Sequence, residues 1–229
     1  MQRTAIFSLL LITSVTLFQR CANPVSPQGG PRDEKPPEMV SCDPPNFNTG
    51  FKTGDIRINF NEFINLKNPA TEVFVSPPQS KAPDIRTRGK SVLISLDDSL
   101  LPQTTYTITF GNAITDLTEG NILRGFSYVM STGSFLDSLS LQGTILSAFD
   151  RKPQKDVLVG FYLPVDTVPV DSMPFVMPPY YVTRSDENGK FILGNLQNRP
   201  GRLFAVSDQN GDMFFSQPNE KIAFLDSTI

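Results

Sequence analysis

Hydrophobic and polar residues alternate in four stretches of the first half of the chain, at residues 55–60, 91–96, 104–110 and 126–130. A period of two is typical of a β-strand that buries one face. The side chains predicted to be buried are Ile56, Ile58, Phe60, Val92, Ile94, Leu96, Tyr106, Ile108, Phe110, Phe126, Tyr128 and Met130. Turn residues separate the stretches and none keeps a helical period, so we expect an antiparallel β-sandwich.

The alternating pattern starts again after residue 138. Residues 139–146 predict an opening strand, and residues 157–163 and 203–206 predict two more. Residues 180–193 predict a hairpin, because Asp-Glu-Asn-Gly at 186–189 favours the left-handed conformations of a tight reversal. The sequence therefore predicts a second small all-β module.

A Pro- and Met-rich insert interrupts the second module at residues 164–179, and we expect it to form a long loop. Aromatic and Met side chains gather around it: Met173, Phe175, Met177, Tyr180 and Tyr181. Aromatic residues in a loop can contact a glycan or a partner peptide. They can also cover the end of the sandwich, and we favour that interpretation.

The amino terminus has the pattern of an export signal. Arg3 precedes an apolar run from Ala5 to Phe18. Fourteen helical residues span about 21 Å, which is short of a bilayer core of about 30 Å. This length after a basic start predicts a signal peptide over residues 1–20 rather than a permanent membrane span.

Cys21 follows the apolar run directly, where a lipoprotein signal has the cysteine that accepts a diacylglycerol. The residues before it resemble such a signal only loosely, because Phe18 and Arg20 depart from the usual Leu and small residue. We predict lipidation of Cys21, with diacylglycerol and an acyl chain such as palmitate; cleavage elsewhere in a secreted protein is the alternative. Seven prolines between Ala22 and Pro45 predict an extended tether.

Composition narrows the function. The chain has 20 Pro, 15 Gly and 18 Phe but no His or Trp. Without His, neither a Ser-His-Asp triad nor a His-ligated metal site can form, so we expect no enzyme and no cofactor. The formal charge is −3 and no basic stripe occurs, which argues against a nucleic-acid partner.

Two acidic groups are candidates for chemistry. Glu62, Asp116 and Glu119 could act as paired carboxylates of a hydrolase, but a turn in which Asp116 bonds local amides is the favoured interpretation. The segment from Asp208 to Asp212 offers Asp208, Asn210 and Asp212 as calcium candidates. Its glycine and the later Glu220 miss the spacing of a calcium loop, which favours a β-turn. Cys42 is expected to be an inert, partly buried thiol.

The first module contains five characteristic motifs: Pro36-Pro37, Asn59-Phe-Asn-Glu62, Leu101-Pro-Gln-Thr-Thr-Tyr106, Phe110-Gly-Asn-Ala-Ile-Thr-Asp116 and the close from Phe126 to Gly133. In these motifs it resembles the bacterial Ig-like domain of the SbsA type. With its Cys-Ala-Asn leader, the chain looks like Ig-like lipoproteins of Bacteroidota. The resemblance implies a structural or adhesive module with no catalytic residues.

The second module contains the motifs Gly143-Thr-Ile145, Asp186-Glu-Asn-Gly-Lys-Phe191, Pro200-Gly201 and Asp208-Gln-Asn-Gly-Asp212. In these motifs it resembles the carboxypeptidase-regulatory-like, or prealbumin-like, β-sandwich. Such modules are non-catalytic supports or binding units.

We therefore expect an all-β protein with two consecutive β-sandwiches. The predicted parts are a signal peptide (1–20), a Pro/Gly-rich tether (21–35), an Ig-like domain (36–134) and a carboxypeptidase-regulatory-like sandwich (135–229). The expected function is that of a lipid-anchored binding or scaffold unit for an envelope protein or a glycan. Ala22 is not an acidic retention signal and favours the outer membrane; the periplasmic and surface faces both stay open. The alternatives are the stalk of a longer protein whose active part lies beyond residue 229, and a carboxylate hydrolase.

Overall fold

The computed structural model describes residues 30–52, 54–96 and 99–229. The strands and helices below all belong to the compact unit Glu34–Ile229. The predicted signal peptide, Cys21 and most of the predicted tether lie outside the described residues. In the part of the chain that is described, no helix is long and apolar enough to cross a membrane.

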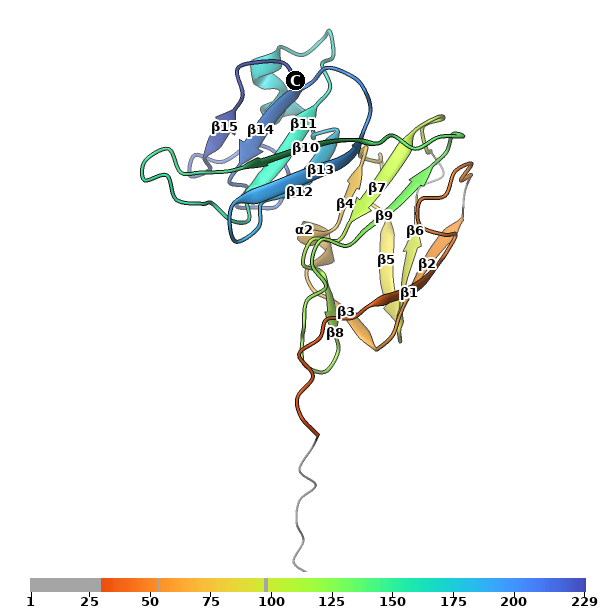
Figure 1. Cartoon of the computed structure of the whole chain (residues 1–229). Coiled ribbons are helices and arrows are strands. Elements are labelled where there is room, and N and C mark those ends of the chain that lie inside the picture. Colours follow the sequence, from red (N-terminus) through yellow and green to blue (C-terminus); the bar gives the residue numbers. More distant parts are fainter. Residues whose placement is uncertain (1–29, 53, 97–98) are drawn as a thin grey trace, which may run out of the picture. The chain divides into compact units, whose positions relative to one another are not determined.

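The first region, residues 39–131, contains three antiparallel sheets (Figure 1). A four-stranded sheet has the order β1-β2-β6-β5, a three-stranded sheet the order β4-β7-β9, and β3 pairs with β8. The strands are β1 (Met39–Asp43), β2 (Asp55–Phe60), β3 (Ile64–Leu66), β4 (Phe74–Ser76), β5 (Asp84–Arg88), β6 (Ser91–Ser95), β7 (Thr105–Thr109), β8 (Ile114–Asp116) and β9 (Ser127–Ser131). One helical turn, α2 (Pro69–Glu72), precedes β4.

One core cluster joins the four-stranded and three-stranded sheets. Ile56 and Ile58 of β2 lie opposite Ile94 and Val92 of β6, and all four side chains are fully buried. The cluster continues through Tyr106, Ile108, Phe110, Tyr128 and Met130. The predicted inward faces are confirmed; Leu96 and Phe126 are partly buried and pack against the same core.

The second region, residues 139–224, contains two antiparallel sheets. The pair β10-β13 forms one, and the order β12-β11-β14-β15 forms the other (Figure 1). The strands are β10 (Leu139–Thr144), β11 (Leu158–Tyr162), β12 (Tyr181–Arg184), β13 (Lys190–Leu196), β14 (Arg202–Val206) and β15 (Ile222–Phe224). The fold class is all-β, as predicted.

Both faces of the second four-stranded sheet are covered in part. On the inner face, Val159 and Phe161 of β11 and Leu203 of β14 pack with Phe191 and Leu193 of β13. The outer face carries two aromatic side chains, Tyr162 and Phe204. The insert that was predicted as a long loop contains two short helical turns, η1 (Val170–Ser172) and α3 (Met173–Val176), and its Met173 packs against both aromatics.

The predicted hairpin at 180–193 is wrong in its pairing. The reversal is present: the Asp186 carboxylate accepts the Asn188 and Lys190 N–H groups, and Gly189 has a φ of +72°. However, β12 pairs with β11 and β13 pairs with β10, so the two strands enter different sheets. Turn residues determine the local reversal, whereas the pairing partners are set by contacts distant in the sequence.

Cys42 lies on β1, partly buried against the first core, as expected. Burial raises the pKa of its thiol, and a hydrogen bond with the Asn46 backbone lowers it by a smaller amount. A thiol with a raised pKa is mostly protonated at neutral pH, which agrees with an inert role.

Candidate functional site

The loop that joins β14 to β15 is organised by two buried carboxylates. The Asp208 carboxylate accepts N–H groups from Gly211, at 2.8 Å, and Met213, at 3.2 Å. An aspartate that bonds backbone amides three and five residues ahead holds a tight turn, and Gly211 supplies the positive φ of +75° that the turn contains. At the base of the loop, the Ser207 N–H donates to the Lys221 carbonyl.

Glu220 closes the same loop from its other end. Its carboxylate accepts three backbone N–H groups, from Gln209, Ser216 and Gln217, at 2.8–3.1 Å. Burial by itself would raise the pKa of Glu220, but the three N–H donors outweigh it and hold the pKa below its ordinary value. The carboxylate is therefore ionised at neutral pH, and its hydrogen bonds stabilise the backbone of the loop.

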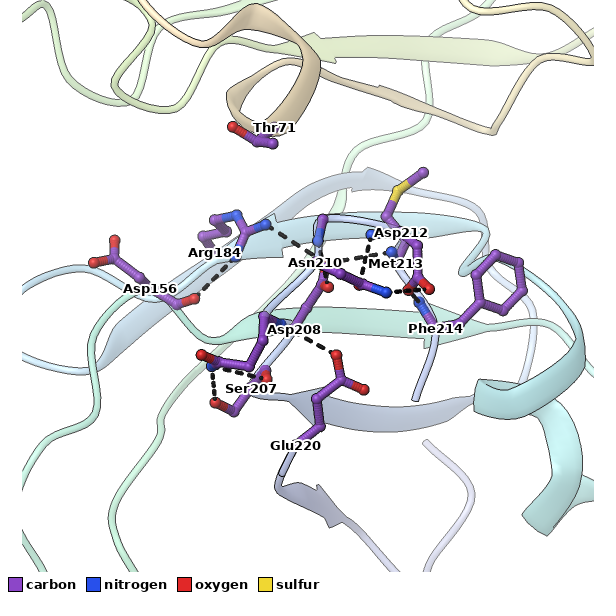
Figure 2. A network of polar contacts seen from close by, with 12 residues as sticks. Thr71, Asp156, Arg184, Ser207, Asp208, Asn210, Asp212, Met213, Phe214 and Glu220 are labelled. Carbon is purple, nitrogen blue, oxygen red and sulfur yellow. Dashed lines mark hydrogen bonds and ion pairs between the residues drawn. The ribbon is translucent and has the colours of Figure 1, made fainter. Parts of the chain in front are cut away.

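Arg184, at the end of β12, supplies the cation for this network (Figure 2). Its guanidinium lies 3.7 Å from the Asp208 carboxylate, whose side chain is fully buried, and donates to the Asp156 carbonyl at 3.0 Å. It also lies over the Phe74 ring, 5.6 Å from the centroid. The sequence contains no signal for this pairing, because Arg184 and Asp208 are distant in the chain and no local pattern links them.

The side-chain oxygens of the calcium candidates Asp208, Asn210 and Asp212 accept hydrogen bonds from groups of the same loop. The Asn210 amide and the Ser216 hydroxyl donate to Asp212, and so does the Phe214 N–H. Burial raises the pKa of Asp212, and these donors lower it by more. Calcium needs six to eight converging oxygens, and the described residues contain no group of three acidic, His or Cys ligands able to hold a metal. The hydrogen bonds support the turn interpretation.

A charged cleft of about 520 Å³ adjoins Arg184. We define the charged cleft by the ionisable residues that line it: Glu72, Arg124, Lys155, Asp156, Arg184, Asp186 and Glu187. Arg124 and Glu187 approach to 3.5 Å on its exposed rim. Both signs of charge occur beside the Phe74 ring, which suits a polar ligand with an apolar face rather than a bare anion.

Asp116, one of the carboxylates considered for acid–base chemistry, binds the backbone of its own turn. Both oxygens of the buried Asp116 accept backbone N–H groups, from Glu119, Gly120 and Asn121, at 2.6–2.9 Å. Burial raises the pKa of Asp116, but these bonds outweigh it and lower the pKa overall. A general acid needs a raised pKa, so Asp116 is a turn residue, which confirms the favoured interpretation.

The aromatic group around the insert is mostly structural. Met173 and Tyr181 are fully buried, and Met177 packs partly against the Tyr162 cluster. Phe175 is 52% exposed and makes an edge-to-face contact with Phe215 at 5.1 Å. The interpretation that these side chains cover the sandwich is confirmed for Met173, Tyr181 and Met177, whereas Phe175 is exposed and contacts the partly buried Phe215.

Comparison with protein families identifies the first region. Residues 33–132 match the model of the bacterial Ig-like domain. This part of the chain is therefore similar to a bacterial Ig-like domain. The match covers the sheets β1 to β9 and the core described above, so the resemblance noted in the sequence holds at the level of the domain. No curated protein matches the chain.

Solved structures give only distant matches. An L,D-transpeptidase from Mycobacterium smegmatis is 10% identical with a TM-score of 0.30, over 74% of this chain and 76% of that one. The N-terminal part of the bacterial S-layer protein SbsC is 10% identical with a TM-score of 0.29, over 83% and 44%. The major pilin subunit of Bacillus cereus is 10% identical with a TM-score of 0.23, over 84% and 65%. TM-scores this low support no conclusion about function.

Proposed function

We propose that this chain is a non-enzymatic protein of the cell envelope, anchored to the outer membrane by a lipid on Cys21, whose β-sandwiches serve as scaffold or binding units. The observation that carries the proposal is the Ig-like domain at residues 33–132. The state of the carboxylates supports it: Asp116 and Glu220 have lowered pKa values because backbone amides bind them. Neither is suited to act as a general acid.

The anchor is supported by the sequence. A basic start, a short apolar run and Cys21 stand in the order of a lipoprotein signal, and a proline-rich segment separates Cys21 from β1. A proline-rich chain is extended at about 3.1 Å per residue, so such a segment lifts a folded unit away from a bilayer.

The charged cleft is the surface we assign to a ligand. Glycans and peptides present hydroxyl, amide and charged groups beside apolar faces, and the cleft offers cations, anions and an aromatic ring to meet them. An envelope glycan or an envelope protein is the partner class that fits both this cleft and the location proposed above.

The anchor is tested by mass spectrometry of the amino-terminal peptide from the full chain expressed in a Gram-negative host. The expected result is a diacylglyceryl and acyl modification on Cys21, and loss of membrane association in Cys21→Ala. An unmodified Cys21, or cleavage at another residue, overturns the anchor.

Binding is tested by co-sedimentation with purified peptidoglycan sacculi and by crosslinking in intact envelopes. Arg124→Glu should weaken binding, because Arg124 lines the charged cleft and is exposed. Arg86→Glu is the matched control, since Arg86 is an equally exposed arginine on β5 that does not line the cleft. Retention on neither sacculi nor any envelope protein contradicts the binding role.

A further inference from the structure

The second region has an apolar groove between the edges of its two sheets. The groove has a volume of about 610 Å³ and is lined by β10 and the turn after it on one side, and by β14 and β15 on the other. Leu141 and Ile145 line the first side and Leu203, Ala205 and Ala223 the second. We call this surface the edge groove. It lies entirely within residues 141–225, away from the charged cleft.

Small side chains leave the edge groove open. Ala205 and Ala223 face each other in the β14-β15 ladder, so no large side chain fills the space beneath β10 at this point. Beyond them, Leu225 is 47% exposed and Phe224 is 61% exposed. Apolar side chains of this size at a strand edge are a sign of an interaction surface.

Main-chain groups border the edge groove on both sides. Within residues 30–52, 54–96 and 99–229, β10 pairs only with β13, and β15 pairs only with β14. The outer edge of each strand therefore presents backbone N–H and C=O groups without a strand partner. An extended chain can pair with these groups while its alternate side chains fill the apolar groove.

Three other sheet edges, at β5, β1 and β12, are protected against strand addition. The β5 edge carries three alternating charges, at Asp84, Arg86 and Arg88. The β1–β2 register shifts between Met39 and Ser41. The β12 edge donates its Val182 N–H to the hydroxyl of Ser76. Charges, irregular register and covering contacts are the usual means of blocking an edge.

β15 is short, with three residues, but it has none of the three protections named above. Its residues, Ile222 to Phe224, include no charge, proline or register shift, and Ile222 faces the outer cluster while Ala223 faces the groove. The single charged side chain that lines the edge groove is Arg151, at one end. A strand that fits this surface has apolar side chains at alternate positions and an acidic side chain that meets Arg151.

We propose that the edge groove binds an extended segment of a partner protein, which adds as a strand to β15 and places an acidic side chain at Arg151. This inference rests on the proposed role as a binding unit and names the class of partner: an apolar, alternating β-strand with one carboxylate. Main-chain hydrogen bonds supply affinity in this mode, and alternate side chains in the groove supply selectivity.

The test uses the full chain and a panel of labelled peptides of about ten residues, the length of an ordinary strand. In each peptide Val or Ile alternates with Thr, and a glutamate occupies a different position. Peptides with proline at every second apolar position are the controls, because proline removes main-chain donors. Binding is followed by fluorescence anisotropy, and the bound segment is located by amide hydrogen exchange.

The proposal predicts that alternating peptides bind, that proline peptides do not, and that exchange slows at residues 222–225. Ala223→Lys should weaken binding at least about tenfold, since an inward lysine blocks an edge. Ala82→Lys, the same change at an exposed position of the first region, should leave binding unaltered. Arg151→Glu, on an exposed turn, should weaken binding of the acidic peptides and remove its salt dependence.

Three results would overturn it. The first is failure of the whole panel to bind a folded protein. The second is binding that neither Ala223→Lys nor Arg151→Glu alters. The third is protection of β15 by self-association, which would make a second copy the occupant. Failure here leaves the lipid on Cys21 and retention on sacculi untouched, since those are measured separately, so it is distinguishable from failure of the proposed function.

Discussion

The two regions each contain a four-stranded antiparallel sheet, but the strands at the outer edges of these sheets differ in charge. In the first region the last strand is β5, with the sequence Asp-Ile-Arg-Thr-Arg, and an Asp84–Arg86 ion pair at 2.9 Å lies along it. In the second region the last strand is β15, with the sequence Ile-Ala-Phe. A charged edge resists pairing with another chain and an apolar edge invites it. The comparison shows that charged side chains protect the outer edge of the first sheet, whereas the outer strand of the second sheet carries no charge.

The largest expected effect on the free energy of unfolding is in the core of the first region. Ile94 is fully buried in the first core, so Ile94→Ala should lower the free energy of unfolding by about 4 kcal/mol. Leu203 is buried in the second core but borders the edge groove, so Leu203→Ala should lower it by about 2 kcal/mol. Chemical denaturation measures both. Equal losses would mean that the second core is as closed as the first.

The next largest effect on the free energy of unfolding is expected at the two buried aspartates, Asp208 and Asp116. Asp208→Ala leaves Arg184 without its carboxylate and two amides without an acceptor, and should lower the free energy of unfolding by about 3 kcal/mol. Asp116→Ala removes an acceptor of three amides but unpairs no cation, and about 2 kcal/mol is expected. Asp84→Ala, at an exposed ion pair, should change it by less than about 0.5 kcal/mol. A larger loss for Asp116→Ala than for Asp208→Ala would show that the cation is unimportant.

Alkaline titration compares the regions through their tyrosines. Burial is the largest cause that raises the pKa of Tyr128, in the first region, and of Tyr181, in the second, each to about 12. The neutral phenol is favoured in the folded state, so its contribution to stability is complete below about pH 10 and is lost as the pH rises through 12. Absorbance at 295 nm should rise late in the folded protein and near pH 10 in denaturant. Early ionisation of these two phenols in the folded state would contradict their burial.

The smallest effect on stability, and the sharpest test of the edges, is expected at β5. Replacing both Arg86 and Arg88 with Val should change the free energy of unfolding by less than about 0.5 kcal/mol, because both side chains are exposed. It should nevertheless promote self-association, seen by analytical ultracentrifugation, because the edge loses its charges. Arg57→Val, on the central strand β2 of the same sheet, is the control and should stay monomeric. Unchanged association in the double variant would show that charge does not protect this edge.

Some of the candidate chemistry could be predicted from the residues alone. The Asp116 turn was expected because short polar side chains bond amides a few residues ahead, and the same reasoning favoured a turn at Asp208. The charged cleft and the Arg184–Asp208 pair were not expected. They depend on side chains from separate strands and loops, whose proximity no local pattern encodes.

The sequence by itself determined the all-β class, the long strands and the faces they bury, because a side-chain period of two is a local property of an extended chain. β2 coincides with its predicted range, and Ile56, Ile58 and Phe60 are buried as expected. Only the tertiary structure decided the short strands such as β15, the separation of β12 from β13, and the edge groove. A strand of three residues has too little alternation to detect, and the choice of partner depends on the packing of distant segments rather than on the strand itself.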